Sequence, residues 1–579
     1  MSNSRAATWI AGLLLLFGLC DVAAGDETAD LILHHGKVVT VDRDFSIRQA
    51  LAVGGGRLLR VGGNDDVLKL RGPDTILVDL GGRMVLPGLI DSHTHPTGAS
   101  MIEFDHPIPD METIDDVLSY VRARAAALGP GKWIVVRQVF ITRLKERRYP
   151  TRDELDRAAP ANPVLFSTGP DASLNSAALK LSGIDKDFRP EGPGKVEIDP
   201  ASGAPTGILR NLTRYVKAAS SERAATESER DQRLLELFAD YHSVGLTAVI
   251  DRDAGPQAID RYQRLHEAGL LSIRMGVSHD VTNLGPLDEI LAAIRRVGEH
   301  PLHRGGPMLR IVGVKCFLDG GMLTGSAFMR EPWGVSRIYS IDDPSYRGVL
   351  FIPRERLAPM VRAAVESGLQ FTAHSVGDGA VHALLDAYEE VDRTIPVAPT
   401  RPCITHSNFM SAPAIERAAR LGVTVDAQPA WLYLDASTLS AQFGYDRLRY
   451  FQPLKSLFAA GVVVGGGSDH MQKIGSLRSI NPYNPFLAMW VAVTRRAKAY
   501  AGRLHPEEAL TREQAIRLYT INNARLLFLE DTIGSLEEGK QADFIVVDRD
   551  LLACPEAEIR DTRVLSTYLD GKRIFERKN

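Results

Sequence analysis

The sequence predicts an α/β protein with a (β/α)8 TIM-type barrel at its centre and a β-sandwich built from both chain ends. Apolar segments of strand length recur along the middle of the chain, and helical patterns separate several of them. This alternation is typical of parallel strands joined by crossover helices. Short alternating strand patterns with Gly pairs flank this middle part on both sides. The 579 residues exceed the ~250 of a barrel alone, so additions are expected.

Eight segments are predicted as barrel strands. Most are apolar on consecutive residues, as expected for strands buried on both faces. They are Val85–Asp91, Leu246–Arg252, Ser272–Ser278, Leu309–Leu318, Leu369–His374, Pro402–His406, Val423–Ala427 and Val462–Gly466. Amphipathic stretches such as "ERLAPMVRAAVESG" and "SAPAIERAARLG" supply the helices between them.

The domain organisation follows from these segments. We predict the first part of the β-sandwich at 26–86, the barrel at 87–525 and the second part of the sandwich at 526–579. The interval from about 99 to 230 holds strand patterns of its own and is too long for one crossover. It is therefore predicted as a subdomain inserted after the first barrel strand.

Residues 1–24 have the layout of a secretory signal peptide: an early Arg, an apolar run from Trp9 to Leu19, and small residues at the end. This predicts export to the periplasm or beyond, with an uncleaved N-terminal anchor as the alternative. Cleavage of this segment would remove Cys20. The other three cysteines are too few for a disulfide framework, and two of them, Cys316 and Cys403, are expected to be buried thiols. The net charge is −4 and no basic stripe is present, so a nucleic-acid partner is not expected.

Ligand-type side chains stand at the ends of the predicted barrel strands. The stretch "LPGLIDSHTHPTG" ends the first strand with His93 and His95, which share one face because they lie two residues apart. The other strand-end residues are Lys315 on the fourth strand, His374 on the fifth, His406 on the sixth and Asp469 after the eighth. Since the C-terminal ends of barrel strands meet at one face, these side chains are predicted to form one site.

The residue types predict a metal centre. Imidazoles and a carboxylate suit divalent ions, Zn²⁺ first, and the set has room for one or two ions. An ion there would lower the pKa of a bound water to about 7. Asp469 would accept a proton from that water and pass it to the leaving group. Two alternatives stay open for Lys315: a carbamate that bridges two ions, or an ammonium paired with Asp319.

The motifs "LPGLIDSHTHP", "VKCFLDGG", "AHSVGDGAVHALLDAYE", "ITHSN" and "GGGSDH" resemble the amidohydrolase superfamily. Their combination resembles its amidohydrolase-3 branch, which includes N-substituted formamide deformylase-like and YtcJ-like proteins. The tail "LYTINNARLLFLEDTIGSLEEGKQADFIVVDRD" is similar to the end of that family, and the resemblance begins near Asp30. It implies metal-site roles for five residues and a catalytic acid/base role for Asp469. The five are His93, His95, Lys315, His374 and His406.

One departure concerns the inserted region. Relatives often carry "DGH" where this chain reads "STGPDASLNSAAL", so that His is absent and Asp171 stands near its place. The substrate of any relative is therefore not inherited, and substrate-binding residues stay unknown. Trp333, Trp431 and Phe317 lie near strand ends, where they would either line an apolar pocket or pack in the core.

These observations predict a metal-dependent hydrolase of carbon–nitrogen bonds other than peptide bonds. The expected substrate is a small molecule, a linear or cyclic amide, with no membrane partner after signal cleavage. One alternative is an esterase or lactonase that uses the same site. The other is a non-catalytic exported protein that binds a metal or solute.

Overall fold

The computed structural model describes residues 28–137, 139–169, 171–191 and 194–578. Its centre is a parallel eight-stranded sheet in the order β8-β14-β15-β16-β17-β18-β19-β20. The strands are β8 (Leu89–Thr94), β14 (Leu246–Ala254), β15 (Arg274–Asp280), β16 (Leu309–Phe317), β17 (Gln370–Ser375), β18 (Cys403–His406), β19 (Thr424–Ala427) and β20 (Val464–Gly466). A parallel bridge between Thr94 and His470 joins the two edges of the sheet just past β20. The predicted barrel is thus confirmed, and it is nearly closed.

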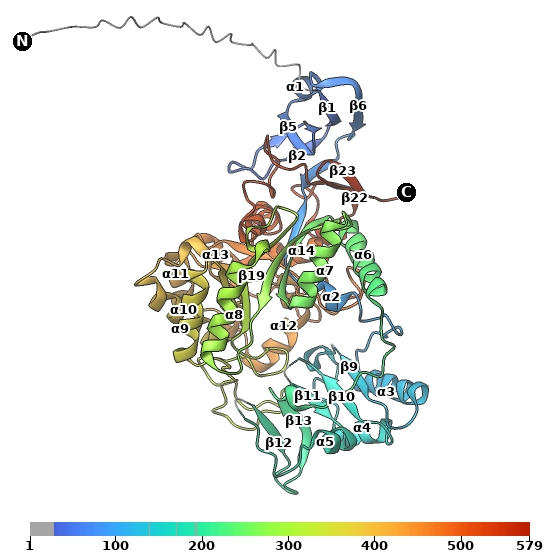
Figure 1. The fold of residues 1–579 in the computed structure, drawn as a ribbon, viewed down its shortest axis with the longest axis vertical. Coiled ribbons are helices and arrows are strands. Elements are labelled where there is room, and N and C mark those ends of the chain that lie inside the picture. The colour runs from blue at the N-terminus through green and yellow to red at the C-terminus, as the bar shows by residue number, and fades with distance from the viewer. Residues whose placement is uncertain (1–27, 138, 170, 192–193, 579) are drawn as a thin grey trace, which may run out of the picture.

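Helices cover the outside of the barrel (Figure 1). Apolar residues recur at helical spacing along several of them, and a few are preceded by a residue whose side chain caps the first turn. α6, for example, starts at a capping box in which Thr226 and Glu229 satisfy each other's backbone N–H groups. The covering helices include α6 (Glu227–Ser243), α7 (Pro256–Glu267), α8 (Leu287–Glu299), α9 (Arg354–Glu366), α10 (Asp378–Asp392), α11 (Ala412–Arg420), α12 (Pro429–Phe443), α13 (Leu454–Ala459) and α14 (Pro485–Thr494).

The first predicted barrel strand, Val85–Asp91, is corrected by the structure. It divides into β7 (Met84–Pro87), which belongs to the β-sandwich, and β8, which belongs to the barrel. The division falls at Gly88, where an added Cβ would lie only 2.2 Å from Thr247 Oγ1. The chain turns from one sheet into the other at the point where it packs closest against β14. A continuous apolar run in the sequence does not reveal such a turn.

Two sheets form the sandwich. One has the order β5-β4-β1-β6, and the other, β23-β22-β21-β7-β2-β3, takes three strands from each chain end. Apolar side chains that include Leu33, Val53 and Phe544 fill the space between them. The strands are β1 (Ala29–His34), β2 (Lys37–Val39), β3 (Ile47–Arg48), β4 (Ala50–Gly54), β5 (Arg57–Gly62), β6 (Arg71–Asp79), β21 (Phe544–Val547), β22 (Val564–Leu569) and β23 (Lys572–Glu576).

Between β8 and β14 the chain forms a five-stranded sheet of order β12-β13-β11-β10-β9. It lies at the end of the molecule opposite the β1–β6 sheet (Figure 1). Its own apolar core includes Leu165, Leu174 and Leu209. The elements are α3 (Ile114–Leu128), β9 (Ile134–Arg137), η1 (Ile141–Arg143), α4 (Arg152–Ala158), β10 (Val164–Ser167), β11 (Ala172–Leu174), α5 (Ser176–Ser182), β12 (Lys195–Ile198) and β13 (Pro205–Arg210).

Buried Arg210 ties this sheet to the loop after β16. Its guanidinium binds Glu197 Oε1 at 2.8 Å and the Thr324 carbonyl at 2.5 Å. Asp171, which stands near the place of the family His, lies beside it at 3.6 Å and accepts the Asn211 backbone N–H. This carboxylate therefore has a structural use inside the inserted region.

Cys316 and Cys403 are free and buried, as predicted. Of the helices that the structure describes, none combines the length and the apolar character needed to cross a membrane. The predicted signal peptide at 1–24 lies outside the described residues.

Candidate metal centre

Three donor atoms meet at the C-terminal end of the barrel. His93 Nε2 lies 3.2 Å from His95 Nε2, and Asp469 Oδ1 lies 3.3 Å and 3.1 Å from these two nitrogens. Two ligands held ~2.1 Å from one ion at a tetrahedral angle are separated by roughly 3.4 Å. The spacing of this triad therefore fits a single divalent ion.

Second partners hold the histidine rings in place. The Nδ1 atom of His93 binds Asp426 Oδ2 at 2.8 Å, and that of His374 binds Asp319 Oδ1 at 3.0 Å. His406 Nδ1 lies 2.8 Å from Gln428 Oε1. A carboxylate or amide oxygen accepts the Nδ1 proton, which leaves the lone pair of a neutral ring on Nε2. Partners of this kind accompany most metal-binding histidines.

His406 joins the triad to the neighbouring strand ends. Its ring centroid lies 4.9 Å from that of His93 and 4.6 Å from that of His374. β16, β17 and β18 pair in parallel register, with Phe317 opposite His374 and Ser375 opposite His406. The strand ends thus bring all four predicted histidines to one face of the barrel.

Asp469 reaches the triad because the backbone after β20 comes very close to β8. An added Cβ on Gly467 would lie 2.8 Å from His93 Cβ, and Asp469 N donates to the His93 carbonyl at 2.8 Å. Asp91 Oδ1 fastens the two segments together by accepting the N–H groups of His93 at 2.9 Å and Ser468 at 3.0 Å. Any larger residue at 467 would push these segments apart.

The inserted subdomain also holds Asp469, through two steps. Asn481 Nδ2 donates to the Asp469 carbonyl at 2.8 Å and lies 3.4 Å from its Oδ2. Arg143 NH1 donates to Asn481 Oδ1 at 3.2 Å, which fixes which end of the amide faces Asp469. Arg143 itself is held by Asp435 Oδ2 on α12 at 2.9 Å. The carboxylate that closes the triad is therefore positioned from outside the barrel.

Lys315 is buried on β16 without an ion pair. Among the described residues, no carboxylate oxygen lies within 4.0 Å of its Nζ. Asp319, the expected partner in one alternative, accepts instead from His374 and from the N–H groups of Phe328, Val376 and Gly377. The predicted alternative of a Lys315–Asp319 pair is therefore not formed. Burial lowers the pKa of Lys315, although the charges of Asp253 and Asp469 oppose this shift.

Carboxylates give the site a negative potential. Burial by itself lowers the pKa of His95, but its neighbours Asp251 and Asp469 raise it to about 10. Burial also lowers the pKa of His93 and of His406. The site thus stabilises positive charge on His95 beside Asp469, while burial favours the neutral form of His93 and His406. Both properties favour binding of a metal cation.

Four residues that hold the candidate ligands in place were not identified from the sequence. Asp426 on β19 and Gln428 directly after this strand, in "VTVDAQ", hold His93 and His406. Applying the strand-end criterion to the seventh strand would have found them. Asn481 and Arg143 carry no such signal, because neither lies at a strand end of the barrel.

The three aromatic residues near the strand ends have different surroundings. Trp333 is buried and donates to the Ala327 carbonyl at 2.8 Å, so it belongs to the core. Phe317 is 41% exposed, and its ring lies 5.4 Å from that of His374. Trp431 stacks on His406 at 5.0 Å, and its buried Nε1 has no hydrogen-bond partner among the described residues. Phe317 and Trp431 therefore border the metal centre.

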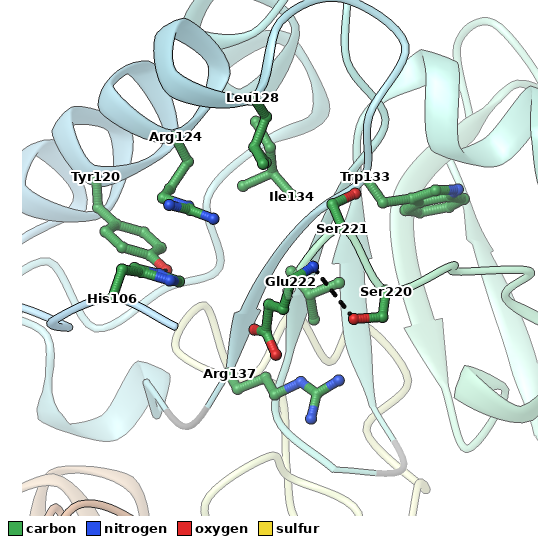
Figure 2. A pocket seen from close by; sticks show the side chains of 11 residues that line it. His106, Tyr120, Arg124, Leu128, Trp133, Ile134, Arg137, Ser220, Ser221 and Glu222 are labelled. Atoms are coloured by element: carbon green, nitrogen blue, oxygen red, sulfur yellow. Dashed lines mark hydrogen bonds between the residues drawn. The ribbon is translucent and has the colours of Figure 1, made fainter. Parts of the chain in front are cut away.

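A separate pocket lies in the inserted subdomain, between α3, β9 and residues 220–222 (Figure 2). Its volume of about 20 Å³ holds roughly one water molecule. The polar side chains include His106 and Tyr120, joined at 2.7 Å. None of the predicted metal ligands lines it.

The Amidohydrolase family model matches residues 77–575. The chain belongs to this family. It is 31% identical to N-substituted formamide deformylase of Arthrobacter pascens, over 95% of this chain and 99% of the relative. It is 26% identical to the putative amidohydrolase YtcJ of Bacillus subtilis (strain 168), over 94% and 99%. The protein is therefore a metal-dependent amidohydrolase, as the sequence motifs predict.

Solved structures share the fold. An uncharacterized metal-dependent hydrolase from Pyrococcus furiosus matches with a TM-score of 0.64 and 24% identity, covering 90% of this chain and all of that one. Atrazine chlorohydrolase TrzN from Arthrobacter aurescens TC1, complexed with zinc, matches with a TM-score of 0.52 and 17% identity, over 94% and 95%. At this identity the two matches support the barrel-and-sandwich architecture alone.

Proposed function

We propose that this amidohydrolase hydrolyses the C–N bond of a small linear or cyclic amide, with Asp469 as the acid/base. The observation that carries the proposal is the triad of His93, His95 and Asp469, whose donor atoms lie 3.1–3.3 Å apart. These three residues would hold one divalent ion, and zinc is the first candidate because the set combines imidazole and carboxylate. His374, His406 and Lys315 would hold a second ion.

When bound, such an ion polarises the substrate carbonyl and makes water acidic enough to react at neutral pH. The chain's own residues direct the proton. One Asp469 oxygen faces the two imidazoles and the other faces the amide of Asn481. From there Asp469 accepts a proton as water attacks the carbonyl carbon, and returns it to the leaving nitrogen as the C–N bond breaks. The products are a carboxylic acid and an amine.

A substrate panel tests the proposal. Metal-replete protein is assayed with N-acyl amino acids, N-substituted formamides and hydantoins, each beside its matched ester or lactone. We expect hydrolysis of at least one amide, with a carboxylic acid and an amine as products. Hydrolysis of esters alone would replace the proposal with an esterase or lactonase, and hydrolysis of neither would favour a binding protein.

We predict that Lys315 is carbamylated when two ions are bound. Its buried amine lacks a carboxylate partner among the described residues, and burial lowers its pKa. The neutral amine adds to CO₂, loses one proton and becomes a carboxylate-like ligand. A 1.5–2 Å structure of protein loaded in bicarbonate, with ~2 equivalents of zinc, should show the added group on Nζ. Density for a plain ammonium away from any ion would contradict this prediction.

We also propose that the protein is exported, on the composition of residues 1–24. The mature chain is predicted to begin near Gly25 or Asp26. Intact-mass measurement of protein from its native host checks this, and a mass that includes Met1 through Ala24 would contradict it.

A further inference from the structure

We propose that His34, His35 and Asp79 form a second divalent-metal site on the β-sandwich, separate from the barrel centre. The three side chains offer two imidazole nitrogens and one carboxylate oxygen within 4.8 Å of one another. This is the same donor composition as that of His93, His95 and Asp469. The proposal does not depend on the proposed hydrolytic function.

The fold brings these residues together at the end of two parallel strands. β1 and β6 pair so that His34 lies opposite Asp79, and His35 follows His34 directly. His35 has a φ of 55°, a left-handed conformation that is uncommon for residues other than Gly. Its backbone N–H donates to Asn64 Oδ1 at 2.9 Å, and its carbonyl accepts from Gly82 at 2.7 Å. Hydrogen bonds therefore hold both the backbone N–H and the carbonyl of His35 in this conformation.

Two of the three donor–donor distances are similar to those in the barrel centre, and the third is at most 4.8 Å. His34 Nδ1 lies 3.2 Å from His35 Nδ1, which lies 3.3 Å from Asp79 Oδ2. Asp79 Oδ1 accepts the Gly81 N–H at 2.9 Å, so the carboxylate presents Oδ2 to the histidines. Donors that share one zinc ion are separated by roughly 3.4 Å. Two of the three donor pairs therefore have about the separation expected of ligands that share one ion.

The environment defines the class of ligand. Imidazole and carboxylate together select borderline ions such as Zn²⁺, Ni²⁺ and Cu²⁺ over Mg²⁺ and Ca²⁺. The side chains of His35 and Asp79 are 54% and 62% exposed, so water completes the coordination. We expect weaker binding here than in the buried barrel centre. Because β6 is an edge strand that pairs only with β1, a bound ion would add a cross-link to this pairing.

The first test is zinc stoichiometry. Wild-type protein and the double variant H34A/H35A are equilibrated with buffered zinc, and the bound metal is measured by elemental analysis. We expect the double variant to bind one ion fewer per chain while keeping the barrel zinc. Asp79→Asn should weaken the same ion. His266→Ala removes one exposed histidine of α7 and serves as the matched control, with unchanged zinc content. Equal zinc in all four proteins would overturn the proposal.

The second test needs no variant. Wild-type protein is treated with diethyl pyrocarbonate, with and without zinc, and each modified histidine is quantified by peptide mass spectrometry. Zinc should protect His34 and His35 from modification and leave His266 unprotected. Equal modification of His34 and His35 in both conditions would show an exposed cluster that binds no ion, and would overturn the proposal even if the double variant failed to fold.

Discussion

Asp469→Asn is expected to lower the turnover of the panel substrate by ~10²–10⁴-fold, the usual effect of removing a positioned acid/base. Asparagine keeps the size of the side chain and one oxygen that can face the imidazoles, but it cannot accept the proton of the attacking water. His93, His95, His374 and His406 are unchanged in this variant, so metal content should hold. Steady-state kinetics and elemental analysis of the same preparation check both expectations.

The outcomes separate the roles that Asp469 can have. If Asp469 acts mainly as a ligand, metal content falls together with turnover. If it only shapes the turn after β20, turnover stays near that of the wild type, and Asp469 leaves the proposed mechanism. Asp531→Asn makes the same chemical change at an exposed position and should leave both quantities unaltered. In the variant the new amide nitrogen would face the Asn481 Nδ2 donor, so the contact to Oδ2 should be lost, whereas the contact of Asn481 with the backbone carbonyl should remain.

Removing the metal is expected to abolish hydrolysis almost completely. An ion that polarises the carbonyl contributes several kcal/mol to the stability of the transition state, so its loss should cost more than about 10²-fold in turnover. Dialysis against dipicolinate should remove the ion, and added zinc should restore activity. His93→Ala should lose both metal and activity without recovery, because it removes one triad donor and leaves Asp426 without its imidazole partner.

This second prediction has its own control. His266→Ala, on the outside of the barrel, should keep the barrel metal and full activity. If wild-type protein reloaded with zinc held less than about a tenth of an equivalent of transition metal, the metal centre itself would be wrong. Retained activity after complete metal removal would instead exclude the ion from the reaction.

The sequence alone determined the barrel and the residues at the C-terminal ends of its strands. Apolar runs of strand length with helices between them specify parallel strands buried on both faces, because only such strands lack a polar face. His93 and His95 were predictable as a pair because side chains two apart on a strand share a face. The other strand-end residues followed from the rule that strand ends of a barrel meet.

Tertiary structure decided what surrounds those residues. Asp426 on β19 orients His93, and Gln428 just after this strand orients His406. Arg143 reaches Asn481 from the inserted subdomain, more than 300 residues away in the chain. The sequence allowed two states of Lys315, a carbamate or an ammonium paired with Asp319. In the structure Asp319 accepts hydrogen bonds from His374 and from backbone N–H groups instead. The turn at Gly88 depends on the approach of Thr247. Periodicity reports which way a side chain points along its own strand, whereas these contacts depend on which distant segments pack against it.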